Sequence, residues 1–288
     1  MKRIGFIGLG VMGKSMARHL VLNGLNVTIY TRTKEKADDL IREGAKWANS
    51  LKEVIEVSDI IITMLGYPSD VMKVYLGDEG LIPNGHSGQI LIDMTTSEPS
   101  LAKKLYNEGE KKGISVVDAP VSGGDIGARN GTLSIMVGGD AKTYDDLKPI
   151  FDFMGTNIVY QGQAGAGQHT KMCNQIAIAT NMIGVCEALV YGKRAGLTIE
   201  DVLKSISTGA AGSWSLDNLA PRMLKGDYEP GFYIKHFIKD LRIALHEAKV
   251  MGLTLPGLTL AEKMYEELSK RGEENSGTQA LYTYWGNE

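Results

Sequence analysis

The first half of the chain places its apolar residues in short runs, and longer segments with helical periodicity separate these runs. Continuous apolar runs bounded by glycine, proline or polar residues are typical of buried parallel strands. The repeated strand–helix order predicts a mostly parallel, doubly wound sheet. The expected strands cover residues 3–7, 27–30, 59–65, 89–94, 114–118, 132–137 and 158–160, and the helices cover 12–24, 34–44, 51–57, 69–76, 99–112 and 143–153.

The pattern changes after Gly162, where only helical periodicity remains. A long helix is expected first, because apolar residues recur at alternating steps of four and three. We therefore expect two domains, an α/β dinucleotide-binding domain over residues 1–163 and an all-helical domain over residues 164–288. The expected helices of the second domain are 170–195, 200–208, 214–225, 233–251, 258–270 and 278–284.

A glycine-rich turn follows the first expected strand directly. Gly8 would allow a tight turn, Gly10 would let a pyrophosphate approach the backbone, and Gly13 would let helix and strand pack closely. The helix that follows would offer unpaired N–H groups to the phosphates. Because a second strand comes next, this turn predicts a Rossmann-type domain rather than chance glycines. The expected cofactor-binding residues here are Gly8, Leu9, Gly10, Val11, Met12 and Gly13.

The end of the second strand indicates which dinucleotide binds. An acidic residue there would bond the ribose hydroxyls of NAD, but residues 30–34 contain none. Arg32 could grip a 2′-phosphate, with help from the Thr31 or Thr33 hydroxyl. We therefore favour NADP over NAD. The alternative is that Arg32 belongs to a solvated basic face of the next helix.

Ligands of a doubly wound sheet bind beyond the carboxyl ends of its strands. Met64, Leu65 and Thr95 fall at that edge of the predicted sheet. Each is a weak indication by itself, since strand ends are plentiful.

A second glycine-rich turn follows the expected strand 114–118, at Ser122, Gly123 and Gly124. Consecutive N–H groups in such a turn can form an anion-binding concavity, and the Ser122 hydroxyl could add a hydrogen bond. A small carboxylate would fit, and a plain surface turn explains the pattern equally well.

The start of the long helix carries Lys171, Asn174 and Gln175. These residues share one face, because residues three and four apart on a helix are neighbours. A lysine beside a packed apolar stripe could lose its proton more easily than a free one. Taken alone, the pattern favours an ordinary surface lysine.

Composition argues against several classes of partner. The formal net charge of −3 gives no basic surface for nucleic acid or anionic membrane. No apolar stretch approaches the ~20 residues of a membrane-spanning helix, so we expect a cytoplasmic protein. The five histidines show no metal-ligand spacing, and no metal site is expected.

Four motifs occur in order along the chain: the glycine turn at 8–13, Asp118-Ala-Pro-Val-Ser-Gly-Gly124, Gly165-x-Gly-x-x-x-Lys171-x-x-Asn174, and Lys239-Asp240-Leu241. Together they resemble the β-hydroxyacid dehydrogenase family, and within it the 3-hydroxyisobutyrate and tartronate-semialdehyde dehydrogenase branch. The resemblance covers essentially the whole chain. It implies a nucleotide-binding domain, an all-helical domain and an active site in the cleft between them.

The resemblance also implies residue roles. Lys171 matches the family's catalytic lysine, and Lys239 matches a residue beside the nicotinamide and the substrate. Many relatives carry a second asparagine where this chain has Gln175, so either Asn174 or Gln175 could contact the substrate. The other matched residues are the substrate-carboxylate loop Ser122, Gly123 and Gly124 and the cofactor contacts Met64, Leu65 and Thr95.

The implied reaction is hydride transfer that interconverts a small 3-hydroxy acid, or 2-hydroxy acid, and its semialdehyde or oxo acid. Lys171 would be the general acid/base, and Arg32, which matches NADP-preferring relatives, favours a semialdehyde or glyoxylate reductase. The alternatives are an imine-reducing relative or a non-catalytic dinucleotide-binding relative, in which the lysine is usually missing. The family also implies a homodimer or homotetramer.

Overall fold

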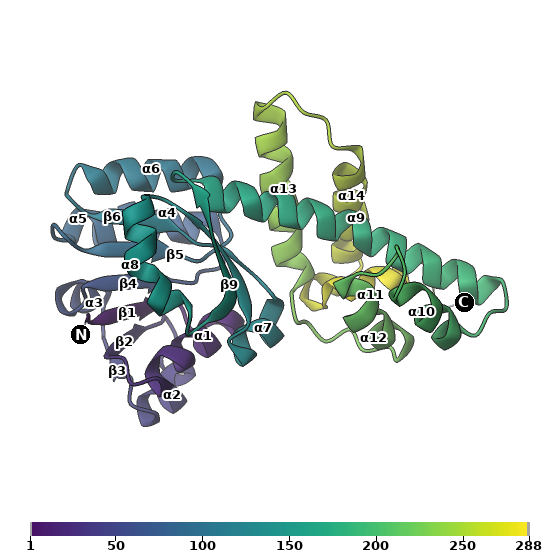
Figure 1. Ribbon diagram of the computed structural model, residues 1–288, viewed down its shortest axis with the longest axis horizontal. Helices are drawn as coiled ribbons and strands as arrows, with labels where there is room; N and C mark the ends of the chain where they lie inside the picture. The colour runs from purple at the N-terminus through teal and green to yellow at the C-terminus, as the bar shows by residue number, and fades with distance from the viewer. Residues whose placement is uncertain (1, 287–288) are drawn as a thin grey trace. The chain divides into compact units, whose positions relative to one another are not determined.

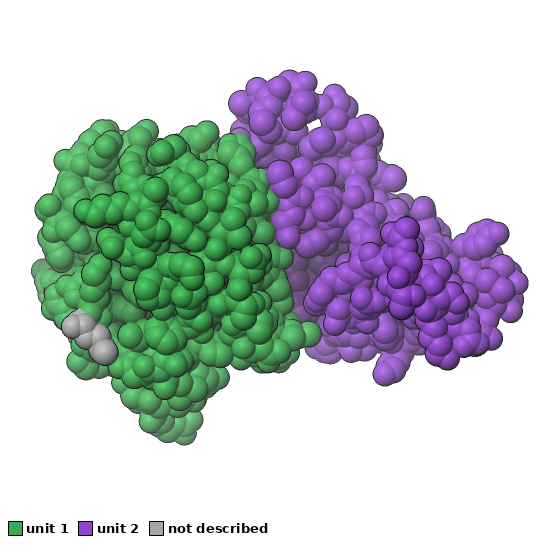
Figure 2. Space-filling view, in the orientation of Figure 1, with its two compact units in different colours: residues 1–171 green, residues 172–288 purple. Residues whose placement is uncertain are grey.

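The computed structural model describes residues 2–286. The chain forms two compact units, Met1–Lys171 and Met172–Glu288 (Figure 2). Figure 1 shows both units and labels many of their helices and strands. The helix that begins at Ala166 continues across the division between them.

The described part of the first unit contains one nine-stranded sheet, ordered β3-β2-β1-β4-β5-β6-β8-β7, with β9 paired to β8. Strands from β3 through β6 are parallel, which is the doubly wound order of a Rossmann domain. β8 runs antiparallel to β6 and β7 and parallel to β9. The strands are β1 (Ile4–Ile7), β2 (Val27–Tyr30), β3 (Lys46–Trp47), β4 (Ile60–Thr63), β5 (Ile90–Asp93), β6 (Ser115–Asp118), β7 (Val121–Ser122), β8 (Leu133–Gly138) and β9 (Gly155–Gly162).

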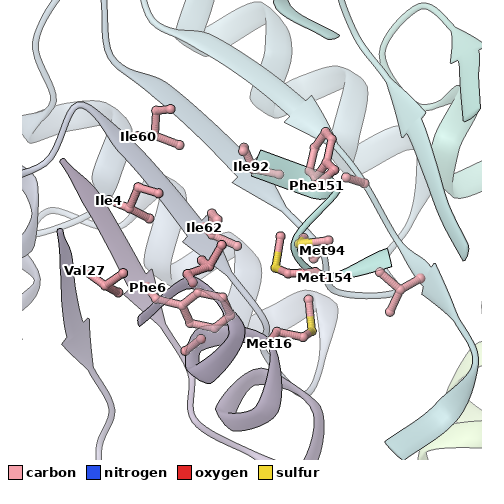
Figure 3. Packing of buried hydrophobic residues seen from close by; sticks show 14 of the residues in the cluster. Ile4, Phe6, Met16, Val27, Ile60, Ile62, Ile92, Met94, Phe151 and Met154 are labelled. Atoms are coloured by element: carbon pink, nitrogen blue, oxygen red, sulfur yellow. The ribbon is translucent and has the colours of Figure 1, made fainter. Parts of the chain in front are cut away.

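Helices cover both faces of this sheet because successive strand residues point to opposite sides. Ile4 and Phe6 of β1 lie in one apolar cluster with α1, α2 and α8, part of which Figure 3 shows. Ile7 lies in the opposite cluster, with α3, α4, α5 and α6. The helices are α1 (Val11–Leu22), the 3₁₀ helix η1 (Lys34–Ala37), α2 (Asp38–Arg42), α3 (Leu51–Val57), α4 (Pro68–Leu76), α5 (Leu81–Asn84), α6 (Pro99–Glu110), α7 (Gly124–Asn130) and α8 (Ala141–Phe151).

The sequence pattern missed the shortest elements of this unit. β3, β7 and α5 are too short to show a period, α7 was not predicted either, and the expected helix 34–44 is divided into η1 and α2. β9 is longer than the expected strand 158–160. The expected helix 69–76 begins one residue earlier, at Pro68, which stands in the first turn of α4, where its fixed φ suits a helix.

The second unit is helical throughout its described residues. Apolar residues of α9, α13 and α14 share one core. The expected helix 214–225 is two helices, because Pro221 cannot supply the backbone N–H that would continue the first one. The elements are α9 (Ala166–Arg194), α10 (Ile199–Ser207), α11 (Trp214–Asn218), α12 (Ala220–Leu224), α13 (Ile234–Val250), α14 (Pro256–Lys270), and the 3₁₀ helices η2 (Glu273–Asn275) and η3 (Thr278–Trp285).

The length of α9 corrects one expectation. Among residues 2–286, this 29-residue helix is long and apolar enough to cross a membrane by length and composition alone. The sequence pattern had suggested that no stretch approached that length. Its apolar side chains form part of the core of the second unit, where Ala179, Met182, Cys186 and Leu189 are fully buried.

A buried polar network joins the ends of β4 and β5. Asp93 is 4% exposed and accepts hydrogen bonds from the Thr63 hydroxyl at 2.9 Å and from the Thr95 N–H at 3.0 Å. The Thr63 hydroxyl also lies 3.0 Å from the Tyr75 hydroxyl. Burial raises the pKa of Asp93 to about 6, although the hydrogen bonds from Thr95 and Thr63 oppose that rise.

This pKa predicts a pH-dependent stability. An unfolded aspartate has a pKa of about 3.9, so the native state binds more protons than the unfolded state between that value and about 6. The stabilisation from this proton is present in full at low pH and is lost as the pH rises through the folded pKa. Asp93→Asn keeps an acceptor oxygen but does not titrate. From pH 4.5 to pH 7, the stability of the variant relative to the wild type should therefore rise by about 2 kcal/mol.

Urea unfolding followed by circular dichroism at both pH values measures this difference. Asp146→Asn, which removes an exposed carboxyl of α8, is the control for a change in net charge. A stability difference between Asp93→Asn and the wild type that is the same at both pH values would contradict the assignment.

Candidate active site

The three glycines of the turn between β1 and α1 have different surroundings. Gly8 has a φ of +99°, and a Cβ there would lie 2.3 Å from the Met64 carbonyl oxygen. A Cβ at Gly13 would lie 2.0 Å from the Gly8 carbonyl oxygen, whereas a Cβ at Gly10 would meet no atom within 4 Å. Gly8 and Gly13 are therefore required by the packing of the protein itself. Gly10 leaves its backbone open to a ligand at the N-terminus of α1, where unpaired N–H groups suit a phosphate.

The other residues of this turn divide by exposure. Leu9 is 2% exposed and belongs to the core, and Met12 is partly buried against the same core. Val11 is 51% exposed. A ligand at this turn can therefore contact the Val11 side chain, whereas the side chain of Leu9 is inaccessible and that of Met12 is only partly accessible.

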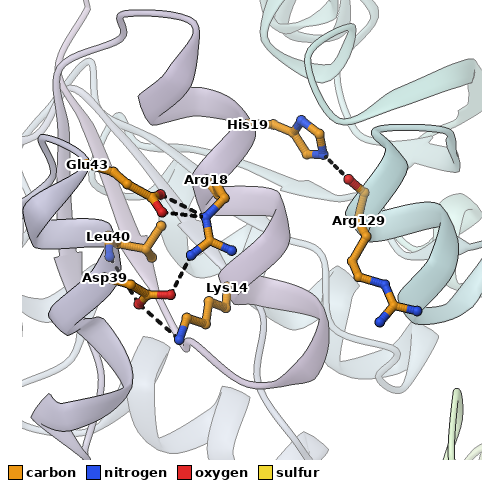
Figure 4. Close-up of polar contacts among 7 residues, drawn as sticks. All are labelled: Lys14, Arg18, His19, Asp39, Leu40, Glu43 and Arg129. Atoms are coloured by element: carbon orange, nitrogen blue, oxygen red, sulfur yellow. Dashed lines mark hydrogen bonds and ion pairs between the residues drawn. The ribbon is translucent and has the colours of Figure 1, made fainter.

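Ion pairs hold α1 against α2. Asp39 of α2 pairs with Lys14 at 2.9 Å and also with Arg18. Arg18 further pairs with Glu43 at 2.7 Å, as Figure 4 shows. These contacts fix the helix whose N-terminus forms part of the glycine turn.

The end of β2 lies next to the glycine turn. The Gly8 N–H donates to the Tyr30 carbonyl at 3.0 Å, so Thr31, Arg32 and Thr33 follow at the same edge. The Arg32 side chain is 87% exposed and its Nη1 lies 3.6 Å from Asp70 Oδ1. The guanidinium group is therefore accessible to a phosphate, and a carboxylate pairs with it in the present structure.

The predicted contacts after β4 and β5 meet at this edge as well. The Leu65 N–H donates to the Thr95 hydroxyl at 2.8 Å, and the Met64 N–H donates to the Ile7 carbonyl at 2.9 Å. The structure therefore brings Met64, Leu65 and Thr95 to the carboxyl edge that carries the glycine turn. Their roles as cofactor contacts stay a prediction.

The second glycine turn lies between β7 and α7. Gly123 and Gly124 have φ values of +129° and +61°, which explains glycine at both positions. Ser122 pairs with β8 across from Ser134. The His19 Nε2–H of α1 donates to the carbonyl of Arg129 at the end of α7, at 3.0 Å (Figure 4). This contact ties the helix of the second glycine turn to the helix of the first.

The N-terminus of α9 is bound to the end of β6 by a carboxylate. Asp118 accepts hydrogen bonds from the N–H groups of Gly165 at 2.7 Å and Gln168 at 2.8 Å. Cβ atoms at Gly138 and Gly167 would lie 2.6 Å and 2.8 Å from its two carboxylate oxygens, so only glycine permits this approach. Burial raises the pKa of the Asp118 carboxyl, and the two backbone donors oppose that rise.

Gln168 forms a second link between α9 and the sheet. Its side chain is fully buried, accepts from the Ser97 N–H at 2.9 Å and donates to the Thr95 carbonyl at 2.7 Å. Lys171 stands three residues further along the same helix and is 7% exposed. The structure thus places Lys171 one turn beyond a helix start that is fixed at the carboxyl edge of the sheet.

The remaining predicted residues lie in the second unit. Gln175 of α9 donates to Asp240 Oδ2 of α13 at 2.6 Å and accepts from the Asn174 Nδ2–H at 2.7 Å. Lys239 lies 2.9 Å from the other carboxylate oxygen, Asp240 Oδ1, in an ion pair. Asn174, Gln175 and Lys239 therefore belong to one polar network around Asp240.

Sequence reasoning did not assign Asp118, Gln168 or Asp240 to the site. Asp118 and Asp240 stand inside recognised motifs, so their place in those motifs was an available signal. Gln168 had no comparable signal, because its partners Ser97 and Thr95 are more than 70 residues away in the sequence. Residues 2–286 contain no group of three or more histidine, cysteine, aspartate or glutamate residues that could hold a metal ion.

Family models match both units. Residues 3–162 match the NAD-binding domain of 6-phosphogluconate dehydrogenase. Residues 165–285 match the NAD-binding domain of NADP-dependent 3-hydroxyisobutyrate dehydrogenase.

Three relatives match nearly the whole chain. An uncharacterised oxidoreductase of Bacillus subtilis is 61% identical over 99% of both chains. Probable 3-hydroxyisobutyrate dehydrogenase-like 1, a mitochondrial protein of Arabidopsis thaliana, is 50% identical over 97% of this chain and 84% of its own length. The 2-hydroxy-3-oxopropionate reductase of Escherichia coli is 37% identical over 97% of this chain and 95% of its own length.

Two solved structures share the whole fold. Mycobacterium tuberculosis 3-hydroxyisobutyrate dehydrogenase with L-serine matches with a TM-score of 0.90 and 28% identity, over 99% of both chains. Psf3 in complex with NADP⁺ and 2-OPP matches with a TM-score of 0.91 and 27% identity, over 98% of this chain and 100% of its own.

The sheet order, the glycine turn and these matches define an oxidoreductase that uses a nicotinamide dinucleotide. The chain belongs to the β-hydroxyacid dehydrogenase family. Its Rossmann-type domain, followed by a helical domain, is the architecture that the sequence predicted.

The two glycines Gly10 and Gly13 predict different effects of substitution by alanine, one on dinucleotide affinity and the other on stability. Gly10 has a φ of −76° and open space around it, so Gly10→Ala should fold normally. Its methyl group would stand where a pyrophosphate approaches the backbone, so dinucleotide affinity should fall by about 10-fold or more. Gly13→Ala would instead strike the Gly8 carbonyl and should lose about 1–3 kcal/mol of stability.

Fluorescence titration with NADPH and thermal unfolding of both variants measure the two effects. A Gly10→Ala variant that binds as tightly as the wild type would show that the ligand does not approach this turn.

Proposed function

We propose that this protein interconverts a small hydroxy acid and its semialdehyde or oxo acid, with Lys171 as the general acid and base. The observation that carries the proposal is the burial of Lys171 one turn after a helix start anchored to the carboxyl edge of the dinucleotide-binding sheet. Lysine side chains are rarely buried in proteins, and those that are buried are often found at functional sites. The names of the Arabidopsis and Escherichia coli relatives support the same class of substrate.

The proposed chemistry needs one proton donor. When bound, the reduced nicotinamide supplies a hydride to the carbonyl carbon of the substrate. The electron pair of the C=O π bond then moves to oxygen, and the Lys171 ammonium group donates a proton to this developing alkoxide. In the reverse direction, the neutral Lys171 amine accepts the hydroxyl proton. The second glycine turn, with Ser122, Gly123 and Gly124, would hold the substrate carboxylate.

Arg32 supports a preference for NADP. Its guanidinium group is exposed at the edge where the adenosine ribose of a Rossmann cofactor lies, and residues 30–34 contain no acid. A planar guanidinium group binds a phosphate through two parallel hydrogen bonds. The NADP⁺ complex of Psf3 is consistent with this proposal.

The substrate class is tested by oxidation of NADPH and NADH with glyoxylate, succinic semialdehyde, tartronate semialdehyde and methylmalonate semialdehyde. Lys171→Met should lower kcat with the preferred substrate by about 100-fold or more, while NADPH binding stays near the wild-type value. Lys193→Met, at an exposed position of the same helix, is the matched control and should keep full turnover. Full activity of Lys171→Met would exclude this residue as the acid and base.

The cofactor preference is tested separately. Arg32→Met should raise the KM for NADPH by about 10- to 100-fold, because a charge-assisted bidentate contact is lost. The KM for NADH should change little. Arg42→Met removes an exposed arginine of α2 and serves as the control. Equal KM changes for both cofactors in Arg32→Met would show that Arg32 does not read the 2′-phosphate.

A further inference from the structure

An ion pair of the first unit lies beside the glycine turn. The strand order places β1 between β2 and β4, so the segments that follow β2 and β4 flank the turn that follows β1. Arg32 stands in the first of these segments, and Asp70 stands in the first turn of α4, which follows β4. Because Arg32 Nη1 lies 3.6 Å from Asp70 Oδ1, this pair joins the two flanking segments.

Backbone contacts place both segments directly against the turn. The Gly8 N–H donates to the Tyr30 carbonyl at 3.0 Å, and a Cβ at Gly8 would lie 2.3 Å from the Met64 carbonyl oxygen. In a Rossmann domain the pyrophosphate lies on this turn, and the adenosine ribose lies at the end of the second strand. A 2′-phosphate that binds Arg32 would therefore also stand near Asp70.

The ion pair is loose. Its 3.6 Å separation is longer than a hydrogen bond, and the side chains are 87% exposed for Arg32 and 29% exposed for Asp70. Exposed pairs of this kind shift an equilibrium by no more than about 5-fold. A phosphate that accepts two parallel hydrogen bonds from the guanidinium group is a stronger partner. It can therefore displace the carboxylate, at a modest cost in affinity.

The carboxylate is held more firmly than the guanidinium group. Asp70 belongs to the first turn of α4, and its N–H donates to the Tyr67 carbonyl at 3.0 Å. The partial positive charge of a helix N-terminus favours a negative side chain at this position. We therefore expect the carboxylate to remain in place when the longer, more exposed Arg32 side chain turns toward a phosphate.

Two negative groups would then share one small region. An anion held by Arg32 would lie within a few ångströms of Asp70, because the guanidinium and carboxylate groups are already 3.6 Å apart. Two unit charges about 6 Å apart in water change an equilibrium by about 3-fold, and a phosphate monoester carries nearly two negative charges. The repulsion is therefore large enough to measure in a binding experiment.

We propose that Asp70 is a specificity-determining residue that weakens the binding of a 2′-phosphorylated dinucleotide. It moderates the NADP preference that Arg32 supports, and the proposal rests on that proposed role of Arg32. Asp70 acts in two ways, since it competes for the guanidinium group and repels the phosphate. A dinucleotide with a 2′-hydroxyl group meets neither effect, so Asp70 discriminates between the two cofactors instead of weakening both.

Removal of this charge should tighten the binding of one cofactor. In Asp70→Asn, the Kd for NADPH should fall by about 3- to 10-fold at low salt, while the Kd for NADH changes by less than about 2-fold. Fluorescence titration measures both constants. The gain for NADPH should shrink to less than about 2-fold in ~0.5 M KCl, where the Debye length is about 4 Å.

Matched variants control for net charge and for folding. Asp78→Asn makes the same change in net charge at an exposed position after the other end of α4, and it should leave the NADPH Kd within about 2-fold of the wild type. Asp70→Glu keeps the charge and should also keep the wild-type Kd. Thermal unfolding checks each variant, and Asp70→Ser removes the same charge if Asp70→Asn does not fold.

A double variant tests whether Asp70 acts in part through Arg32. In Arg32→Met there is no guanidinium group to compete for, so only the repulsion of the phosphate remains. The gain in NADPH affinity from Asp70→Asn should therefore be at least about 2-fold smaller in the Arg32→Met background than in the wild type. The same gain in both backgrounds would contradict the competition.

The outcomes separate this proposal from the one on which it rests. Equal effects of Arg32→Met on NADPH and NADH would overturn the cofactor role of Arg32, and the role of Asp70 with it. If Arg32→Met weakens NADPH selectively, an Asp70→Asn variant with an unchanged NADPH Kd would overturn the role of Asp70 alone. An equal gain for NADH, or an equal gain in Asp78→Asn, would do so as well.

Discussion

The position of Lys171 depends on one buried carboxylate at the start of a helix. Asp118 ends β6 and accepts hydrogen bonds from two N–H groups of the first turn of α9. A helix N-terminus has unpaired donors and a partial positive charge, so a carboxylate is well accommodated there even when it is buried. The approach is close enough that a Cβ at Gly138 or Gly167 would strike its oxygens. The sheet edge and the helix thus determine each other's position.

This junction connects the sheet edge that carries the glycine turn to the helix that carries Lys171. Gln168 adds two hydrogen bonds to the backbone of the loop after β5, and Thr95 in that loop also bonds Leu65 after β4. The glycine turn abuts Met64 at the same edge. Residues that the sequence separates widely therefore share one hydrogen-bonded edge. A helix that starts at this edge carries Lys171 and then Asn174 in a rigid register, because an α-helix fixes the angular relation of residues three apart.

Much of the fold could be predicted because the sequence pattern of each helix or strand lies within a short segment of the chain. Each long strand from β1 to β6 is a continuous apolar run, and the glycine turn stands between a strand and a helix. The short elements β3, β7 and α5 lacked enough residues to show a period. The apolar length of α9 was underestimated because scattered polar residues interrupt its run, although its core side chains were visible as a stripe.

The site was harder to predict because its bonds are long-range. Lys171 and Asn174 were recognisable from a motif, but the pairing of Gln175 with Asp240 spans 65 residues. The choice between Asn174 and Gln175 stayed open in the sequence, since both amides carry the same groups. The structure shows that both ends of the Gln175 amide are bonded inside the fold, to Asp240 and to Asn174. The link from Asp118 to Gly165 spans 47 residues, and no local pattern reports such a contact.

Transfer of an isotopic label tests the central claim most directly. The wild-type protein would reduce its preferred oxo acid with NADPH that carries deuterium at nicotinamide C4 on the transferred face, and proton and deuterium NMR would locate the label. We expect deuterium on the new carbinol carbon of the hydroxy acid and hydrogen from solvent on its oxygen, as hydride transfer with proton donation requires. Product whose carbinol carbon carries only solvent hydrogen, with the deuterium retained by the cofactor, would contradict the account.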